Sequence, residues 1–242
     1  MSFMRSASAV AVVAAIAAGG MAPAASAVTP APASTASATA QTVKLTKEER
    51  AQILDFFREN QVPRPAQMRL LHKLERGQAW DSMLGKQAVH TETFTHQGAQ
   101  VTLERFADGS VSRSEVQDPT LAAPVGEASI MGITGCRTTS SSLYHANYVN
   151  CYANVDLGVV MMGFHFDRNT VRDMPGKITK YYSHTYRIIG GALHGFRYTK
   201  FNDQQVRLTA DFSVAFKGFP AGWDAWMQVN LGRGTSVWTT HN

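Results

Sequence analysis

The chain has 242 residues, of which 44% are hydrophobic and 17% are charged, and its formal net charge is +5 at pH 7. A basic balance favours anionic partners, which outside a cell are wall polymers and lipid head groups, although solubility alone is the alternative explanation. No groove-reading helix and no basic stripe with interleaved aromatics is evident, so nucleic acid is not an expected partner. Beyond the N-terminus no apolar stretch approaches the length of a membrane span, and we expect no transmembrane segment.

The N-terminus predicts a secretory signal peptide over residues 1–27. A polar lead with Arg5 is followed by an apolar core from Ala9 to Ala18 and by the small residues Ala25-Ser26-Ala27, which is the order of a cleaved signal. The apolar core is about half of the roughly 20 residues that a spanning helix needs, so an uncleaved anchor is the weaker alternative. We expect cleavage after Ala27 and a secreted, extracellular protein.

Residues 28–44 predict a flexible lead. This segment is rich in Ala, Pro, Ser and Thr, and it holds too little apolar surface to offset the entropy of ordering it.

The part from 45 to 117 predicts a helical hairpin and a small β-meander. Thr46 and Glu49 fit a capping box, Pro63 ends the first helix, and a second helix runs from near Pro65 to Gly77. Alternating residues from 89 to 116, with turn signals at 96–99 and 107–110, indicate three short antiparallel strands.

The part from 128 to 242 predicts an antiparallel β-domain. From Val206 to Phe216 large apolar residues alternate with mostly polar ones, which indicates a strand that is buried on one face. The overall prediction is an α+β fold whose second domain is an antiparallel β-sandwich or open barrel. The other strands are expected at 143–155, 158–166, 180–189, 193–201, 226–231 and 236–240.

Two short motifs resemble a pattern found in exported actinobacterial hypothetical proteins. They are LHKLERGQAWDSM at 71–83 and FADGSVS at 106–112. In those proteins KLExGxxWDS follows a helical pair and precedes a YADGS turn, for which this chain has Phe106 in place of Tyr. The resemblance implies export and a Cys-containing, strand-rich C-terminal region, and it transfers no catalytic residue.

Cys136 and Cys151 are the two cysteines of the chain. In an oxidising compartment an even pair at this spacing predicts a disulfide. Buried reduced thiols are the alternative. A cysteine nucleophile is not expected because the disulfide would occupy both thiols, and a zinc site is not expected because no histidine stands at a ligand spacing. We expect no metal and no cofactor.

No motif assigns a catalytic residue. The C-terminal region holds several histidines, aspartates and the Ser140–Ser142 run, but it lacks a G-x-S-x-G elbow and the helical H-x-x-x-H spacing. An extracellular hydrolase with an unrecognised site is therefore the alternative function. It would require a hydroxyl, a histidine and a carboxylate to converge in a pocket.

The leading hypothesis is a non-enzymatic binding or interaction domain at the cell envelope or outside the cell. From residue 128 onward 11 Lys and Arg stand against 6 Asp and Glu, and aromatic rings beside cations suit sugars or anionic polymers. Core packing of these aromatics is the alternative. The expected partners are an anionic envelope polymer, a carbohydrate or another exported protein, and the candidate binding residues are Trp223, Trp226, Tyr182 and Arg187.

Overall fold

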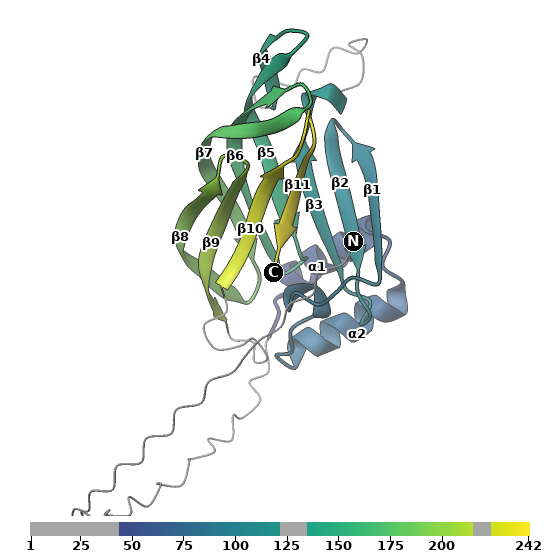
Figure 1. Ribbon diagram of the computed structural model, residues 1–242. Coiled ribbons are helices and arrows are strands. Elements are labelled where there is room, and N and C mark those ends of the chain that lie inside the picture. The colour runs from purple at the N-terminus through teal and green to yellow at the C-terminus, as the bar shows by residue number, and fades with distance from the viewer. Residues whose placement is uncertain (1–43, 122–134, 215–223) are drawn as a thin grey trace, which may run out of the picture. The chain divides into compact units, whose positions relative to one another are not determined.

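Two helices followed by two antiparallel sheets make up the part of the chain that the computed structural model describes, residues 44–121, 135–214 and 224–242 (Figure 1). The arrangement confirms the predicted α+β class with a sandwich-like β-structure. The predicted signal peptide and nearly all of the predicted lead, residues 1–43, lie outside the described residues.

The helical hairpin forms where the sequence predicts it. Helix α1 spans Lys47–Glu59 and begins with the complete capping box between Thr46 and Glu49. Helix α2 spans Arg64–Glu75 with a proline in its first turn. Neither helix is long and apolar enough to cross a membrane.

The segment 71–83 connects helix α2 to a more distant part of the chain. Trp80 is fully buried, and its Nε1 donates to the Leu70 carbonyl at 2.9 Å. In the short 3₁₀ helix η1, Asp81–Met83, the Ser82 amide donates to Ser110 Oγ at 3.1 Å. The segment 71–83 therefore ties α2 to Ser110, which belongs to the segment 106–112.

The large sheet has seven strands in the order β1-β2-β3-β5-β6-β7, with β4 paired to β5. Because β3 pairs with β5, with Arg113 opposite Asp156, one sheet joins strands of both predicted parts. Strand β4 was not predicted, since its sequence RTTSS is exposed throughout and has no apolar alternation. The bounds are β1 His90–His96, β2 Ala99–Arg105, β3 Val111–Gln117, β4 Arg137–Ser141, β5 His145–Asp156, β6 Val160–Val171 and β7 Met174–Ile188, and the 3₁₀ helix η2, Pro119–Leu121, follows β3.

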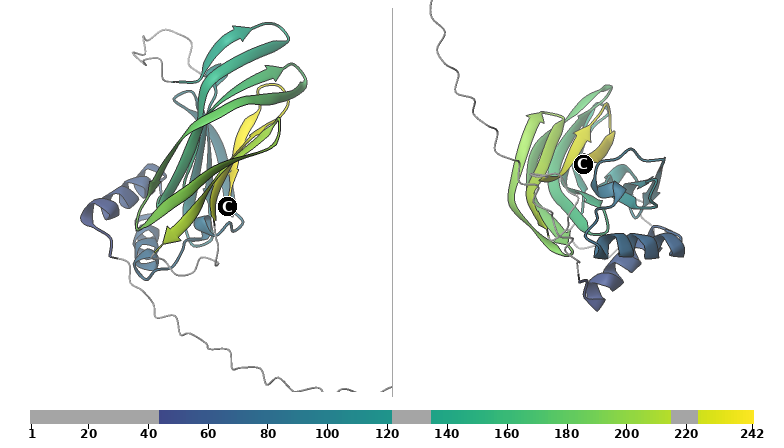
Figure 2. Two further views of the ribbon diagram at one scale, coloured as in Figure 1. Left: turned by 90° about the vertical axis from the view of Figure 1, so that its left-hand side faces the viewer. Right: turned by 90° about the horizontal axis from the view of Figure 1, so that it is seen from below.

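The small sheet has four strands in the order β11-β10-β9-β8. It covers one face of the large sheet, and β11 lies across β3 (Figure 1). The two sheets form two layers in the view from below (Figure 2). The bounds are β8 Gly191–Asn202, β9 Gln205–Val214, β10 Asp224–Leu231 and β11 Val237–His241.

The core lies between the sheets and continues beneath the helices. The predicted alternation of β9 is confirmed, because Val206, Leu208 and Ala210 are fully buried. On the large sheet, Phe164 and Phe166 of β6 are buried in the same apolar cluster. Burying alternate residues on one face sends the intervening side chains of β9 and β10 to the outside.

Candidate binding face

The four candidate binding residues do not share one face. Trp226 lies on the outer face of the small sheet, on β10. Tyr182 and Arg187 lie on β7 and point to the outer face of the large sheet, opposite His165 and Met161 of β6. Trp223 lies outside the described residues. The structure therefore offers two separate surfaces to compare.

Arg207 of β9 is the centre of the small-sheet face. Its guanidinium carbon lies 3.9 Å from the Trp226 ring centroid and 4.9 Å from the Phe201 ring centroid. These rings come from β10 and β8, the strands on either side of β9. The Phe201 side is open, since 53% of that residue is exposed. Two aromatic rings and one cation thus form a single surface, which we call the Arg207 platform.

A chain of side-chain hydrogen bonds runs from the Arg207 platform towards β11. Arg207 Nε donates to Gln228 Oε1 at 3.1 Å, and Gln228 Nε2 donates to Asn230 Oδ1 at 2.7 Å. Asn230 Nδ2 then donates to Thr240 Oγ1 at 3.2 Å. Gln228 and Asn230 are both buried, and each amide is held in one orientation by its partners, so the chain fixes Arg207 from within the sheet face. Trp238, which is 42% exposed, stands opposite Asn230 on β11.

Arg197 lies on the same face but differs from Arg207 in its partners. Its Nη1 is 2.5 Å from Asp211 Oδ1 and its Nη2 is 2.6 Å from Asp224 Oδ2. These two aspartates neutralise the Arg197 charge. Arg207, by contrast, has no ion-pair partner within residues 44–121, 135–214 and 224–242.

On the large-sheet face, the polar ends of Tyr182 and Arg187 are engaged within the protein. The Tyr182 hydroxyl donates to Asp167 Oδ1 at 3.0 Å. Arg187 Nη2 donates to both carboxylate oxygens of Asp156, at 3.0 and 2.8 Å. Burial raises the pKa of Asp156, and the charge of Arg187 opposes that shift. These contacts give both predicted residues a stabilising role within the sheet.

A groove of about 550 Å³ runs beside Asp156 on the large-sheet face. Arg113 and Glu115 of β3 line it as well, and they pair with each other at 2.5 Å. The charged strand residues that line the groove, Arg113, Glu115 and Asp156, therefore each have an oppositely charged partner within the sheet. Among the described residues no group of three or more His, Cys, Asp or Glu side chains is placed to hold a metal ion.

A serine, a histidine and a carboxylate converge between the two sheets. His241 Nε2 lies 3.1 Å from Ser112 Oγ and 3.2 Å from Glu104 Oε2, and the Ser112 hydroxyl also donates to Glu104 at 2.8 Å. A hydrolase triad places the hydroxyl and the carboxylate on different ring nitrogens, whereas here both contact the same one. Ser112 is also completely buried. These hydrogen bonds connect β11 to the strands β2 and β3.

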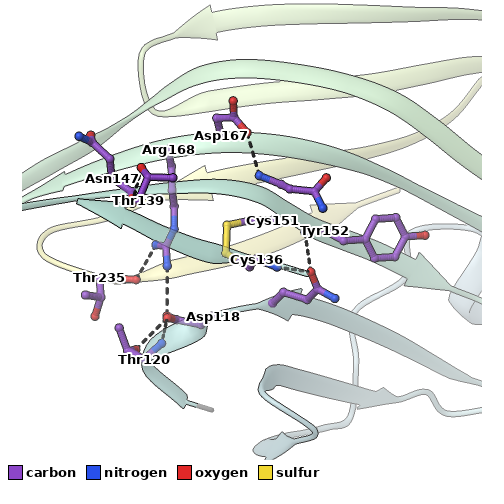
Figure 3. The surroundings of a disulfide bond; sticks show 12 residues. Asp118, Thr120, Cys136, Thr139, Asn147, Cys151, Tyr152, Asp167, Arg168 and Thr235 are labelled. Carbon is purple, nitrogen blue, oxygen red and sulfur yellow. Dashed lines mark hydrogen bonds and ion pairs between the residues drawn. A yellow bond between two sulfur atoms is a disulfide. The ribbon is translucent and has the colours of Figure 1, made fainter. Parts of the chain in front are cut away.

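The predicted disulfide between Cys136 and Cys151 is present (Figure 3). It attaches the residue before β4 to the buried face of β5. Close to it Arg168, 1% exposed, has its Nη2 3.2 Å from Asp118 Oδ2 and donates from Nη1 to the Thr235 carbonyl at 2.8 Å (Figure 3). These contacts join the end of β3, strand β6 and the turn between β10 and β11.

Of the three residues in the Arg207 platform, the sequence predicts Trp226 but neither Arg207 nor Phe201. The alternation of β9 places Arg207 outside, which is visible in the sequence. That Phe201 and Trp226 converge on it depends on strand pairing, which the sequence does not show. Comparisons with protein-family models, with curated proteins and with solved structures found no match for this chain.

Proposed function

We propose that this chain is an exported protein whose β-sandwich is a non-enzymatic binding domain, and that the Arg207 platform binds a glycan at the cell envelope or outside the cell. The observation that carries the proposal is the surface made by Trp226, Arg207 and Phe201, in which the buried Gln228 amide holds Arg207 in place. Sugar rings stack on aromatic faces, and guanidinium N–H groups donate to sugar hydroxyls.

Export is supported by the disulfide, because such bonds persist in oxidising compartments. It is also supported by the predicted signal peptide. Binding at the small-sheet face is favoured over the large-sheet face because Tyr182 and Arg187 already satisfy Asp167 and Asp156. Among the described residues no carboxylate pairs with Arg207, and Phe201 is 53% exposed.

The experiment is a binding survey of the secreted protein on a glycan array and on insoluble wall polysaccharides. Trp226→Ala should weaken binding by about tenfold or more, which corresponds to roughly 1.4 kcal/mol. Phe94→Ala is the matched control, since Phe94 is an exposed ring, 40% accessible, on β1 of the other sheet. Equal loss in both variants, or no glycan bound by the parent protein, would contradict the proposal.

A further inference from the structure

We propose that the glycan carries an oxyanion group, a carboxylate or a phosphate, and that Arg207 is the residue that recognises it. This inference rests on the proposed function, because it names the class of ligand for the same platform. It goes further in that it makes charge the basis of selection among glycans.

Two arginines on one sheet face are paired unequally. Arg197 forms ion pairs with Asp211 and Asp224, which neutralise its charge within the protein. Arg207 donates from Nε to the neutral Gln228, and within the described ranges no carboxylate lies within ion-pair distance of it. A half-buried cation with no internal counter-charge is a ready partner for an anion from outside.

The Arg207 guanidinium is held in place before a ligand binds. Trp226 and Phe201 lie against the guanidinium from the two neighbouring strands, and Gln228 fixes its Nε edge. The rings and the amide restrict the rotation of a side chain that is otherwise flexible, so less entropy is lost when a ligand binds. The Nη donors that remain can bind two oxygens of one carboxylate or phosphate in a bidentate pair.

The exposed rings on this face favour a glycan over other anions. A free phosphate or a lipid head group would need the cation alone, whereas this face adds the exposed rings of Phe201 and Trp238, which are 53% and 42% accessible. Stacking on these rings suits an extended chain of sugars that runs across the strands. The oxyanion would then sit over Arg207 while neighbouring sugars contact the rings.

The experiment uses two matched pairs of polysaccharides with the full secreted protein. Polygalacturonate is compared with its carboxyl-reduced form, and phosphomannan with its dephosphorylated form, by isothermal titration calorimetry. We expect the acidic member of one pair to bind at least about tenfold more tightly than its neutral counterpart. The pair that shows the difference identifies the oxyanion.

Variants locate the effect at Arg207. Arg207→Gln should abolish the preference for the acidic form, Arg207→Lys should restore part of it, and Arg197→Gln should leave it unchanged. Thermal melts of each variant show that the fold is kept.

The outcomes separate the two proposals. Equal binding of acidic and neutral forms by the parent protein would overturn the role of Arg207 and leave the glycan platform standing. A preference that survives in Arg207→Gln would likewise overturn this inference. Binding to none of the four polysaccharides, together with an empty glycan array, would overturn both proposals.

Discussion

Lys73 Nζ lies 2.8 Å from Asp108 Oδ2, and this ion pair joins helix α2 to the turn between β2 and β3. The same carboxylate oxygen accepts the Asp81 amide at 3.0 Å. Its other oxygen accepts the Ser110 amide and hydroxyl, at 2.9 and 2.6 Å. The segments 71–83 and 106–112 thus meet at one aspartate, which gives both of them a structural role.

Asp108→Asn should destabilise the protein by about 1 to 3 kcal/mol at pH 7, because a largely buried carboxylate loses its charge-assisted bonds. Burial would raise the pKa of Asp108, but hydrogen bonds from Lys73 and Ser110 outweigh it and lower the pKa from 3.8. The stability that Asp108 supplies is therefore complete above its unfolded pKa and is lost as the pH falls through the lower, folded value. Urea titrations between pH 7 and pH 2 measure both effects.

The control for this prediction is Asp55→Asn. Asp55 forms an ion pair with Arg58 on the exposed side of α1, where both side chains are more than half accessible. An exposed pair contributes little, so this variant should match the parent at every pH. If Asp108→Asn also matched the parent at every pH, the junction would not depend on this carboxylate.

Gly158→Ala should be strongly destabilising. Gly158 has a φ of +82°, and a Cβ atom there would lie 2.7 Å from Cδ1 of Phe56. Backbone strain and a clash with a buried ring act together, so we expect a loss of about 2 kcal/mol or more. Gly234→Ala is the matched control, since its φ is +61° with nothing within 4 Å. Similar shifts in Tm for both variants would show that strain alone matters.

Much of the fold could be predicted because its signals are local. The capping box at Thr46, the prolines between the helices and the alternation of β9 each lie within a few residues of chain. Pairing between distant strands leaves no such signal. The β3–β5 pairing and the position of β11 across β3 therefore appear only in the structure.

The candidate site could be predicted only in part for the same reason. Composition pointed to Trp226, but it could not distinguish Tyr182, whose hydroxyl is bound to Asp167, from an open aromatic residue. Nor could it show that Arg207 lacks the aspartates that surround Arg197. Whether an arginine on this face has an ion-pair partner is set by neighbours from other strands.

His241→Ala should release β11 without removing an enzymatic activity. Hydrogen bonding to His241 and Ser112 lowers the pKa of Glu104, whereas burial opposes that shift. Without the imidazole, the Glu104 carboxylate keeps the hydrogen bond from Ser112 but loses the one to β11. We expect faster hydrogen exchange at β11 amides and no change in the hydrolysis of p-nitrophenyl esters. Ester hydrolysis that disappears in both His241→Ala and Ser112→Ala, with the fold intact, would instead favour a hydrolase.

Export should yield a mature chain that begins at Val28. The prediction follows from the apolar core and the Ala25-Ser26-Ala27 exit. Expression in a secreting actinobacterial host followed by N-terminal sequencing of the culture fluid gives the answer. Arg substituted for Ala25 should block cleavage, since the processing enzyme requires a small residue there. A secreted chain that retains Met1 would show that the segment is not a cleaved signal.

Reduction of the Cys136–Cys151 bond should lower the free energy of unfolding. The bond closes a loop with a sequence separation of 15, and a cross-link of that length restricts the unfolded chain by about 3 kcal/mol. Cys151 is fully buried in the core while Cys136 precedes the exposed strand β4, so the loss of stability should appear first at β4.

Alkylation and intact-mass measurement with and without reductant establish the bond. Hydrogen exchange of the Cys136→Ser, Cys151→Ser double variant locates its effect. Two alkylated cysteines in the non-reduced protein would contradict the bond, and unchanged exchange at β4 in the double variant would show that pairing with β5 alone holds that strand.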